Sequence, residues 1–340
     1  MPGDKLLAVK QGRELFREVY RKEISEEVFC HKHFGNPNAL ATPYIIESKN
    51  DAPVGMRWLM KLKFCCGDSV IWGVQSSDDA VSSEAGGLLF LKMRKKTLSI
   101  LKEEKIDFEY GCFYPGTAME IAEKSGEKNV VNLYMARLYL NEKKHRWKRF
   151  DIPLPSVVRT PLLKGRRKKL QKSACNDLTV QINRKCPFSE EDYKLINGND
   201  DLHIERTRAY YDWKTAYEKE LFFITARMES KLCGFLIIKK EAEHATVIDW
   251  DAFGNNRSEV LASMLEPVCT DFQYLDIPSL NVESGEMTLF TDLGAKDMSG
   301  LWAPVCICMK PVSDNVAEIV GNPAVWKHRL IDADYFLNGE

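Results

Sequence analysis

Two adjacent glycines, Gly86 and Gly87, stand directly before a leucine-rich run that is typical of a helix. The first N–H groups of a helix have no partner inside it, and the helix dipole is positive at that end. Glycines there let the backbone approach an anion closely, so the stretch could hold a phosphate group. The alternative is a tight turn that needs glycine only for its shape. The residues that would form the anion site are Ala80, Val81, Glu84, Gly86, Gly87, Leu88 and Leu89.

A second group of candidate residues lies in the stretch VIDWDAF, at positions 247–253. Side chains alternate along a strand, so Asp249 and Asp251 share one face and Trp250 lies on the other. Two neighbouring carboxylates can raise the pKa of one of them, which would make that group a base at neutral pH. A polar strand end or a pair of surface acids would give the same pattern. His244 and Glu84 are further candidates for the base.

The composition is that of a globular protein: of 340 residues, 44% are hydrophobic and 29% charged, and the net charge is −1. A net charge near zero gives no argument for a nucleic-acid partner. No apolar stretch approaches the roughly 18 residues of a membrane-spanning helix. The first residues carry charges throughout, unlike a signal peptide.

The ten cysteines are scattered along the chain. Adjacent cysteines such as Cys65 and Cys66 rarely form a useful disulfide, and this usage fits a reducing cytoplasm better than secretion. The stretch CHKH, at 30–33, offers three metal ligands, but no second cluster with metal-ligand spacing lies nearby. We therefore expect a solvated loop or helix end there, and no metal.

Hydrophobic periodicity predicts an alternation of strands and helices in the first 140 residues. The expected elements are a helix at 13–29, two strands within 42–64, a strand at 70–81, a helix from 88 to 101, a strand at 107–115, a helix at 117–128 and a strand at 130–140. In the helix from residue 88, Leu88, Leu91, Leu98 and Leu101 share one face, while basic residues such as Arg94 occupy much of the rest. The strand–helix–strand unit at 71–114 can be parallel.

A basic stretch separates this half from the rest of the chain. From Lys143 to Lys172 nearly every charge is positive, Asp151 is the single acid, and three prolines interrupt the stretch. The pattern predicts a connector between two domains, at 143–185. It is either a solvated linker or a surface that meets an anionic group.

The second half repeats the order of elements with hardly any identical residues. The expected elements are helices at 190–199 and 205–219, two strands within 221–241, a strand at 244–255, a helix at 257–272, a strand at 273–281, a helix at 286–297 and a strand at 302–312. The aromatic cluster at 210–217 is either core packing or a platform for a sugar ring.

This order, present twice, resembles the GNAT acyltransferase superfamily. The segment DDAVSSEAGGLLFLKM, at 78–93, occupies the place of the family's acyl-CoA-binding strand, loop and helix, whose loop pattern is [Q/R]xxGx[G/A]. Gly87 stands for the central glycine, while Gly86 and Leu89 replace the basic and the small residue on either side. Downstream, Pro115 and Gly126 match the proline and glycine of the family's next helical segment. The second half resembles members found with polysaccharide genes.

The resemblance implies an α/β fold of two GNAT-like domains, each a mixed, mostly antiparallel sheet flanked by helices. The expected boundaries are 1–142 for the first domain, 143–185 for the connector and 186–340 for the second domain. Acetyl-CoA or another acyl-CoA would be the donor substrate, held by the segment at 80–89. The family often places a tyrosine as proton donor in the short helix after the donor site. Those positions hold Ala122 and Phe290 here, so Tyr114 or Tyr134 would have to donate.

The leading hypothesis is a cytoplasmic acyl-CoA-dependent N-acyltransferase that acts on a small amine, such as an amino sugar. Asp249 and Asp251 would then lie near the acceptor, without a metal, a membrane span or a nucleic-acid partner. One alternative is a catalytically inactive ligand-binding or scaffolding protein. Another is an aminoacyl-transferase of the Fem type, which takes aminoacyl-tRNA and would hold it with the basic connector. The oligomeric state stays open.

Overall fold

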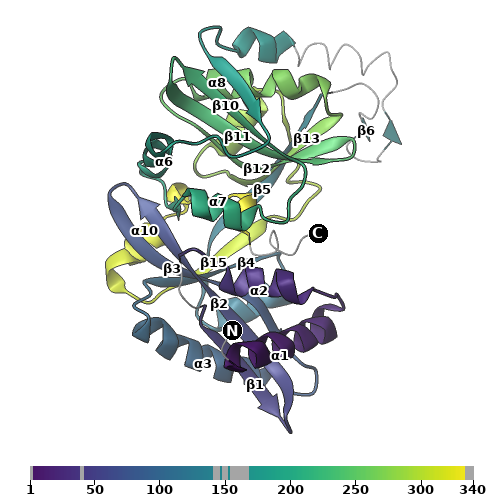
Figure 1. The fold of residues 1–340 in the computed structure, drawn as a ribbon, viewed down its shortest axis with the longest axis vertical. Coiled ribbons are helices and arrows are strands. Elements are labelled where there is room, and N and C mark those ends of the chain that lie inside the picture. Colours follow the sequence, from purple (N-terminus) through teal and green to yellow (C-terminus); the bar gives the residue numbers. More distant parts are fainter. Residues whose placement is uncertain (1–2, 39–41, 141–145, 148–151, 154–167, 334–340) are drawn as a thin grey trace.

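The structure, a computed structural model, describes residues 3–38, 42–140, 146–147, 152–153 and 168–333. Figure 1 shows an elongated molecule with most of the first half of the chain at one end and most of the second half at the other, while the last part of the chain, drawn in yellow, lies beside the first half. Much of the predicted basic connector falls outside the described residues. None of the described helices has the length and apolar character needed to cross a membrane.

The first half contains the predicted order of strands and helices. Its elements are α1 (Gly3–Tyr20), α2 (Glu26–Phe34), β1 (Tyr44–Lys49), β2 (Ala52–Cys66), β3 (Ser69–Val81), α3 (Gly87–Glu103), β4 (Phe108–Phe113), α4 (Thr117–Lys124) and β5 (Lys128–Tyr139). The expected parallel unit is confirmed, because β3 pairs with β4 in parallel.

The single helix expected at 13–29 is wrong, since two helices cover this region. Arg21 adopts a left-handed backbone conformation with φ of 57°, which ends α1. Ser25 then begins α2 by accepting a hydrogen bond from the Val28 N–H, and two acidic residues follow it in the first turn. The stretch Ser-Glu-Glu was the sequence signal for this second start.

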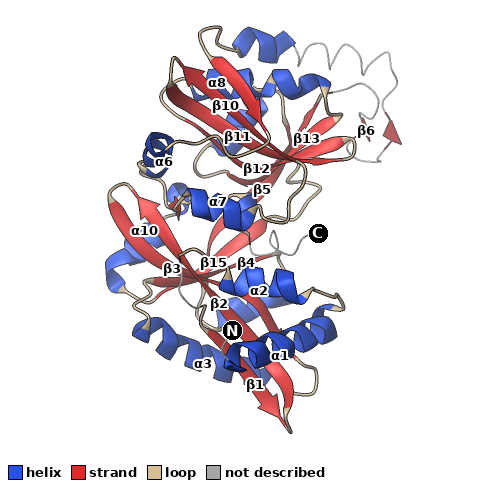
Figure 2. Cartoon of the chain, viewed as in Figure 1, coloured by secondary structure: helices blue, strands red, loops and turns tan. Residues whose placement is uncertain are grey.

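The second half repeats this order with short strands added. Figure 2 distinguishes its helices from its strands by colour. The short strands β6 (Arg146–Trp147) and β7 (Ile152–Pro153) form a separate pair. The remaining elements are β8 (Thr179–Asn183), α6 (Glu190–Asn197), β9 (His203–Ile204), α7 (Arg208–Lys214), β10 (Leu221–Met228), β11 (Lys231–Glu241), β12 (His244–Ala252), α8 (Arg257–Leu265), η2 (Pro267–Thr270), β13 (Tyr274–Asn281), α9 (Glu286–Asp292), β14 (Lys296–Asp297), β15 (Val305–Pro311), η3 (Asp314–Val316), α10 (Ala317–Gly321), η4 (Pro323–Val325) and η5 (Leu330–Asp332). Strand β8 lies within the range predicted as connector and pairs with β10.

One continuous sheet of 13 strands joins the two halves, and its central strands are exchanged between them. The order along the sheet is β1-β2-β3-β4-β15-β5-β13-β12-β11-β10-β8. Strand β15 of the second half therefore lies between β4 and β5 of the first half. Strand β5 of the first half lies between β15 and β13 of the second half. The hydrogen bonds of each half's last strand are completed by the other half.

The core also crosses between the halves. Phe64, Phe108 and Tyr110 of the first half pack in one cluster with Tyr210, Trp213 and Trp326 of the second half. Three residues of the predicted aromatic cluster, Tyr210, Tyr211 and Trp213, are at most 3% exposed, which supports core packing for them.

We predict that replacing Trp326 by alanine lowers the free energy of unfolding by about 3–5 kcal/mol. Its ring lies within 5.8–6.2 Å, centroid to centroid, of Phe64, Phe108 and Tyr110, and its Nε1 donates to the Val320 carbonyl. The matched control is Trp302→Ala, at a side chain that is 54% exposed, with an expected change within about 0.5 kcal/mol. Denaturant unfolding followed by circular dichroism measures both. Equal decreases in the free energy of unfolding for the two variants would contradict a core formed jointly by the two halves.

Candidate functional site

The site begins where two parallel strands separate. Strands β3 and β4 pair at Gly73–Phe108, Val74–Glu109 and Gln75–Tyr110, and their pairing ends there. Beyond this point β3 continues along β2 as far as Val81, while β4 continues along β15 as far as Phe113. The two facing edges therefore carry backbone N–H and C=O groups that no strand pairs within the described part of the chain.

A cavity of about 580 Å³ lies at this opening, with residues of α1, β3, α3, β4 and α4 in its wall. Its lining residues are Tyr20, Ser76, Asp78, Asp79, Val81, Ser82, Ser83, Gly86, Phe90, Cys112, Phe113, Ala118, Ile121, Ala122 and Glu127. The volume is in the range of small-molecule and cofactor sites.

The glycine turn forms one edge of the cavity. Gly86 precedes α3 with φ of 72° and ψ of 160°, a conformation that essentially only glycine adopts, and no side chain caps the helix. The Leu89 N–H bonds to the Gly86 carbonyl, whereas the structure shows no backbone bond from the Gly86 or Leu88 N–H among the described residues. This arrangement can receive an anion.

The other predicted residues of this segment take different positions. Val81 and Gly86 line the cavity, but Ala80 is buried on the opposite face against Met56 and Trp58. Glu84 and Leu88 are exposed. Leu89 packs over Gly55. A Cβ added to Gly55 would lie 2.9 Å from the Leu89 Cδ2, so the leucine occupies the space that a larger residue at position 55 would need.

The predicted burial of α3 holds at its C-terminal end, where Leu101 is buried, and is wrong at its N-terminal end. Leu88 is 81% and Leu91 46% exposed, while Met93, Arg94 and Thr97 are on the buried face. Arg94 belongs to a charged cluster beside the cavity. Its ion pairs with this cluster place the Arg94 side chain on the buried face of the helix. Periodicity misassigned the face because a paired arginine can be buried like an apolar residue.

This charged cluster consists of two arginines and three carboxylates: Arg57, Arg94, Asp79, Glu109 and Glu127. Arg57 and Arg94 both bind Glu109, and Arg94 also binds Glu127. Asp79 lies 3.4 Å from Arg57, and its Oδ1 has no hydrogen-bond partner among the described residues.

Asp79 has the protonation behaviour expected of a base at neutral pH. Burial raises the pKa of its carboxyl to about 7, with Glu109 and Glu127 adding to the rise while Arg57 and Arg94 oppose it. Burial also raises the pKa of Glu127. Our sequence analysis missed Asp79, although a pair of acids directly before the glycine turn was an available signal.

The neighbouring acid, Asp78, has the opposite environment. Burial works against its ionisation, but Lys32 and His33, at 2.9 Å each, hold the pKa of Asp78 well below its usual range. The expectation of a solvated loop or helix end at CHKH is therefore wrong in part, because these residues lie at the end of α2 but Lys32 and His33 are fully buried. No group of three or more His, Cys, Asp or Glu side chains in the described residues could hold a metal ion.

The second half has an equivalent opening that its own chain fills. Strands β12 and β13 pair in parallel only at Ala245–Leu275 and Thr246–Asp276. The C-terminal segment 322–333 occupies the space beyond. Asn281 Nδ2 donates to the carbonyls of Pro323 and Trp326.

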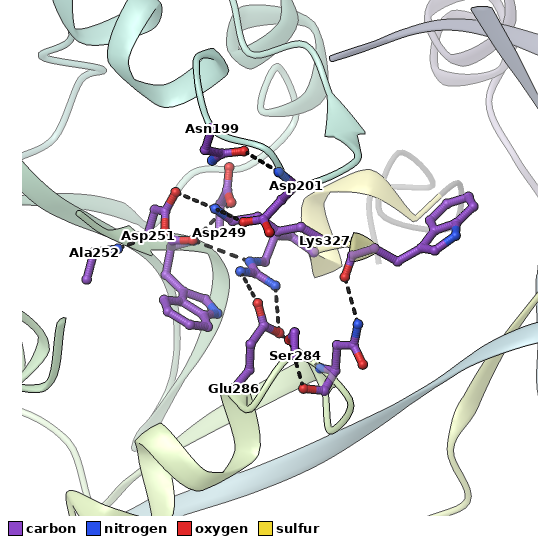
Figure 3. Close-up of polar contacts among 12 residues, drawn as sticks. Asn199, Asp201, Asp249, Asp251, Ala252, Ser284, Glu286 and Lys327 are labelled. Carbon is purple, nitrogen blue, oxygen red and sulfur yellow. Dashed lines mark hydrogen bonds and ion pairs between the residues drawn. The ribbon is translucent and has the colours of Figure 1, made fainter. Parts of the chain in front are cut away.

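Arg329 of this segment donates to the Trp250 carbonyl and pairs with Glu286 at the start of α9. Figure 3 shows Glu286, Lys327, Asp249 and Asp251 gathered in this filled space. The remaining cavity is only about 10 Å³, which is room for about one water.

Asp249 and Asp251, the predicted base candidates, lie at this second opening. Both line the small cavity, as the strand alternation predicts, and they are 2% and 4% exposed. Asp249 accepts from Arg206 at 3.0 Å and from the Tyr211 hydroxyl at 2.9 Å. Burial raises the pKa of Asp249, whereas Lys327 overcomes burial and lowers the pKa of Asp251. Their role as bases stays a prediction.

The predicted proton donor Tyr114 follows the last residue of β4 and is 62% exposed. It is not among the described residues that line the large cavity. Tyr134 packs partly buried against the core of the second half. The structure thus brings the glycine turn together with Asp79 and Glu127 but not with Asp249, Asp251 or Tyr114.

Solved structures share this architecture. The chain matches a protein from Enterococcus faecalis V583, described as a probable N-acyltransferase, with a TM-score of 0.62 and 13% identity over 89% of this chain and 70% of that one. It matches Eis1 from Mycobacterium abscessus with a TM-score of 0.59 and 9% identity over 93% and 74%. A tandem GNAT protein from the clavulanic acid biosynthesis pathway matches with a TM-score of 0.55 and 9% identity over 92% and 96%.

No family sequence model matches the chain, and no curated protein sequence matches it significantly. The structural likeness establishes the fold. The chain has the tandem GNAT fold, and the fold class that the resemblance implied is confirmed.

We predict that Asp79→Asn changes how stability depends on pH. The folded wild type keeps the Asp79 proton up to about pH 7, whereas the unfolded chain loses it near the ordinary value of about 3.9. The wild-type contribution to stability is therefore full below about pH 4 and falls as pH rises between about 4 and 7, by up to about 1.4 kcal/mol per unit.

Asparagine cannot ionise, so the difference in unfolding free energy between wild type and variant should change with pH over this interval. Denaturant unfolding at several pH values measures it. Asp51→Asn, in the exposed turn between β1 and β2, is the control and should give a constant difference. A pH-independent difference for Asp79→Asn would contradict the raised pKa.

Proposed function

We propose that the protein is an acyl-CoA-dependent N-acyltransferase whose first half binds the donor. The observation that carries this proposal is that, of two equivalent strand openings, the one in the first half holds a cavity of about 580 Å³ and the other is filled. The unpaired edges of β3 and β4 would bind the amide groups of the donor's pantetheine arm. The diphosphate would lie against the N–H groups at Gly86 and Leu88.

The acceptor is proposed to be a small amine, such as an amino sugar, and the transferred group a short acyl group such as acetyl. An amine is protonated at neutral pH and must lose a proton before it can attack a carbonyl carbon. Asp79 lines the cavity and titrates near pH 7, so it can take that proton. The burial and ion pairs of Asp249 and Asp251 favour a structural role for them instead.

We expect coenzyme A to bind the wild type in isothermal titration calorimetry, and Gly86→Ala to weaken binding about tenfold. A side chain at this φ and ψ costs about 1–3 kcal/mol and moves the N–H groups from the anion. Gly254→Ala is a matched control, because Gly254 also has a positive φ of 80° and also has open space around its missing Cβ.

The control should leave coenzyme A affinity unchanged. Absence of binding to the wild type at millimolar coenzyme A would end the proposal. Strong, salt-sensitive binding of tRNA in its place would favour the aminoacyl-transferase alternative.

We further expect Asp79→Asn to lower kcat for transfer of acetyl from acetyl-CoA to an amino sugar by about 10²–10⁴-fold. The pH profile of the wild type should rise through about pH 7, and this rise should be absent in the variant. Release of coenzyme A, followed with a thiol reagent after protein removal, measures the rate, and Asp51→Asn is the control. Donor binding without any turnover in the wild type would favour a ligand-binding protein.

A further inference from the structure

A cysteine and a histidine from opposite halves meet at the donor cavity. Cys112 lies on β4, two residues beyond the point where β3 and β4 separate, and it lines the cavity. Its Sγ lies 3.5 Å from Nε2 of His328, which belongs to the C-terminal segment that fills the second opening. This pairing of a thiol with an imidazole is a common way to activate a nucleophile.

Gln75 fixes the thiol at the apex of the opening. Its Nε2 donates to Cys112 Sγ at 3.8 Å, and Gln75 is the last residue of β3 that pairs with β4. Gln75 is fully buried, and Cys112 is half-buried. The sulfur is thus held between a donor from β3 and an imidazole.

The imidazole is in the form that accepts a proton. His328 is 3% exposed, and burial lowers its pKa to about 4, with Lys214, Arg206 and Arg329 adding to the decrease and Asp332 opposing it. It is therefore neutral at pH 7, and Nε2 can accept a hydrogen bond from the facing thiol. Because so low a pKa makes the imidazole a weak base, it takes the thiol proton only as the sulfur attacks. The neighbouring ring of Tyr110 lies edge-on, with its centroid 6.1 Å away.

The thiols on the adjacent strand have no histidine partner among the residues that the structure describes. Cys306 and Cys308 of β15 pack with Ala122, Phe113 and Met119 under α4. Burial raises the pKa of Cys306, and it raises the pKa of Cys308 to about 12. Cys306 and Cys308 therefore act as apolar core residues, because their thiols stay protonated at neutral pH.

We propose that Cys112 accepts the acyl group from acyl-CoA before the acceptor amine receives it, so that transfer takes place in two steps. This proposal rests on the proposed function. In the first step the thiol proton passes to His328 Nε2 and the sulfur attacks the acyl carbonyl carbon. A bond forms between that carbon and Cys112 Sγ, the bond to the sulfur of coenzyme A breaks, and the leaving thiolate takes the proton from the imidazolium.

In the second step the amine, deprotonated by Asp79, attacks the acyl-cysteine. The new C–N bond forms as the bond to Sγ breaks, and the amine's remaining excess proton passes through His328 to the Cys112 sulfur. One thioester is exchanged for another in the first step, so no oxidant, reductant or external energy source is needed.

The test is to mix the full-length protein with acetyl-CoA in the absence of an acceptor, quench it with acid, and measure its intact mass. We expect the wild type to gain one acetyl group, and peptide mapping to place that group on Cys112. Cys112→Ala should not gain it, while Cys233→Ala, which removes a half-buried thiol on β11 outside the cavity, should gain it as the wild type does. His328→Gln should slow the gain at least tenfold.

A second readout does not depend on any variant. The wild type should exchange labelled coenzyme A into acetyl-CoA without an acceptor, because the first step is reversible. Absence of exchange and of an adduct, with normal amine acetylation by Cys112→Ala, would overturn the cysteine step and leave the proposed function standing. An adduct on other cysteines alone would also overturn it. Failure of the proposed function would instead appear as no coenzyme A binding in calorimetry.

Discussion

The exchange of β5 and β15 is the constraint on which the candidate site depends. Strand β4 can separate from β3 because its other edge is hydrogen-bonded to β15, which comes from the second half. Without that pairing, β4 would have two unsatisfied edges in the interior of the molecule, and each buried unpaired amide costs about 1–3 kcal/mol. The opening in the first half is therefore stabilised by the last strand of the second half.

The two openings, similar in backbone, differ in what occupies them. In the first half the charged cluster of Arg57, Arg94 and three carboxylates stays beside the cavity and leaves it accessible. In the second half Lys327 and Arg329 enter the opening and neutralise Asp251 and Glu286. The charged residues of the first opening thus pair with one another beside an accessible cavity, whereas those of the second opening pair with the C-terminal segment that fills it.

Local patterns in the sequence predicted the order of elements and the fold. They could not predict which distant segments meet at the site, because those pairings leave no local pattern. The glycine turn at Gly86 and the parallel unit at 71–114 follow from short stretches and were identified. The exchange of β5 and β15 could not be predicted, because either half's own last strand satisfies the same local pattern. The raised pKa of Asp79 comes from its burial, with Glu109 adding to the rise and Arg57 opposing it, and no spacing in the sequence links these residues on different strands. The C-terminal segment was given no role because the contacts that place it at the two openings are with residues distant in sequence.

The C-terminal segment 322–333 has a consequence for how such a protein can evolve. It fills one opening with Lys327 and Arg329 and, between them, delivers His328 to the other. Loss of this short tail would uncover the second opening and remove the histidine from the first, whereas a gene fission that separated the halves would remove only the histidine from the first opening. Each half therefore depends on this one segment, the second half for a filled opening and the first for its histidine.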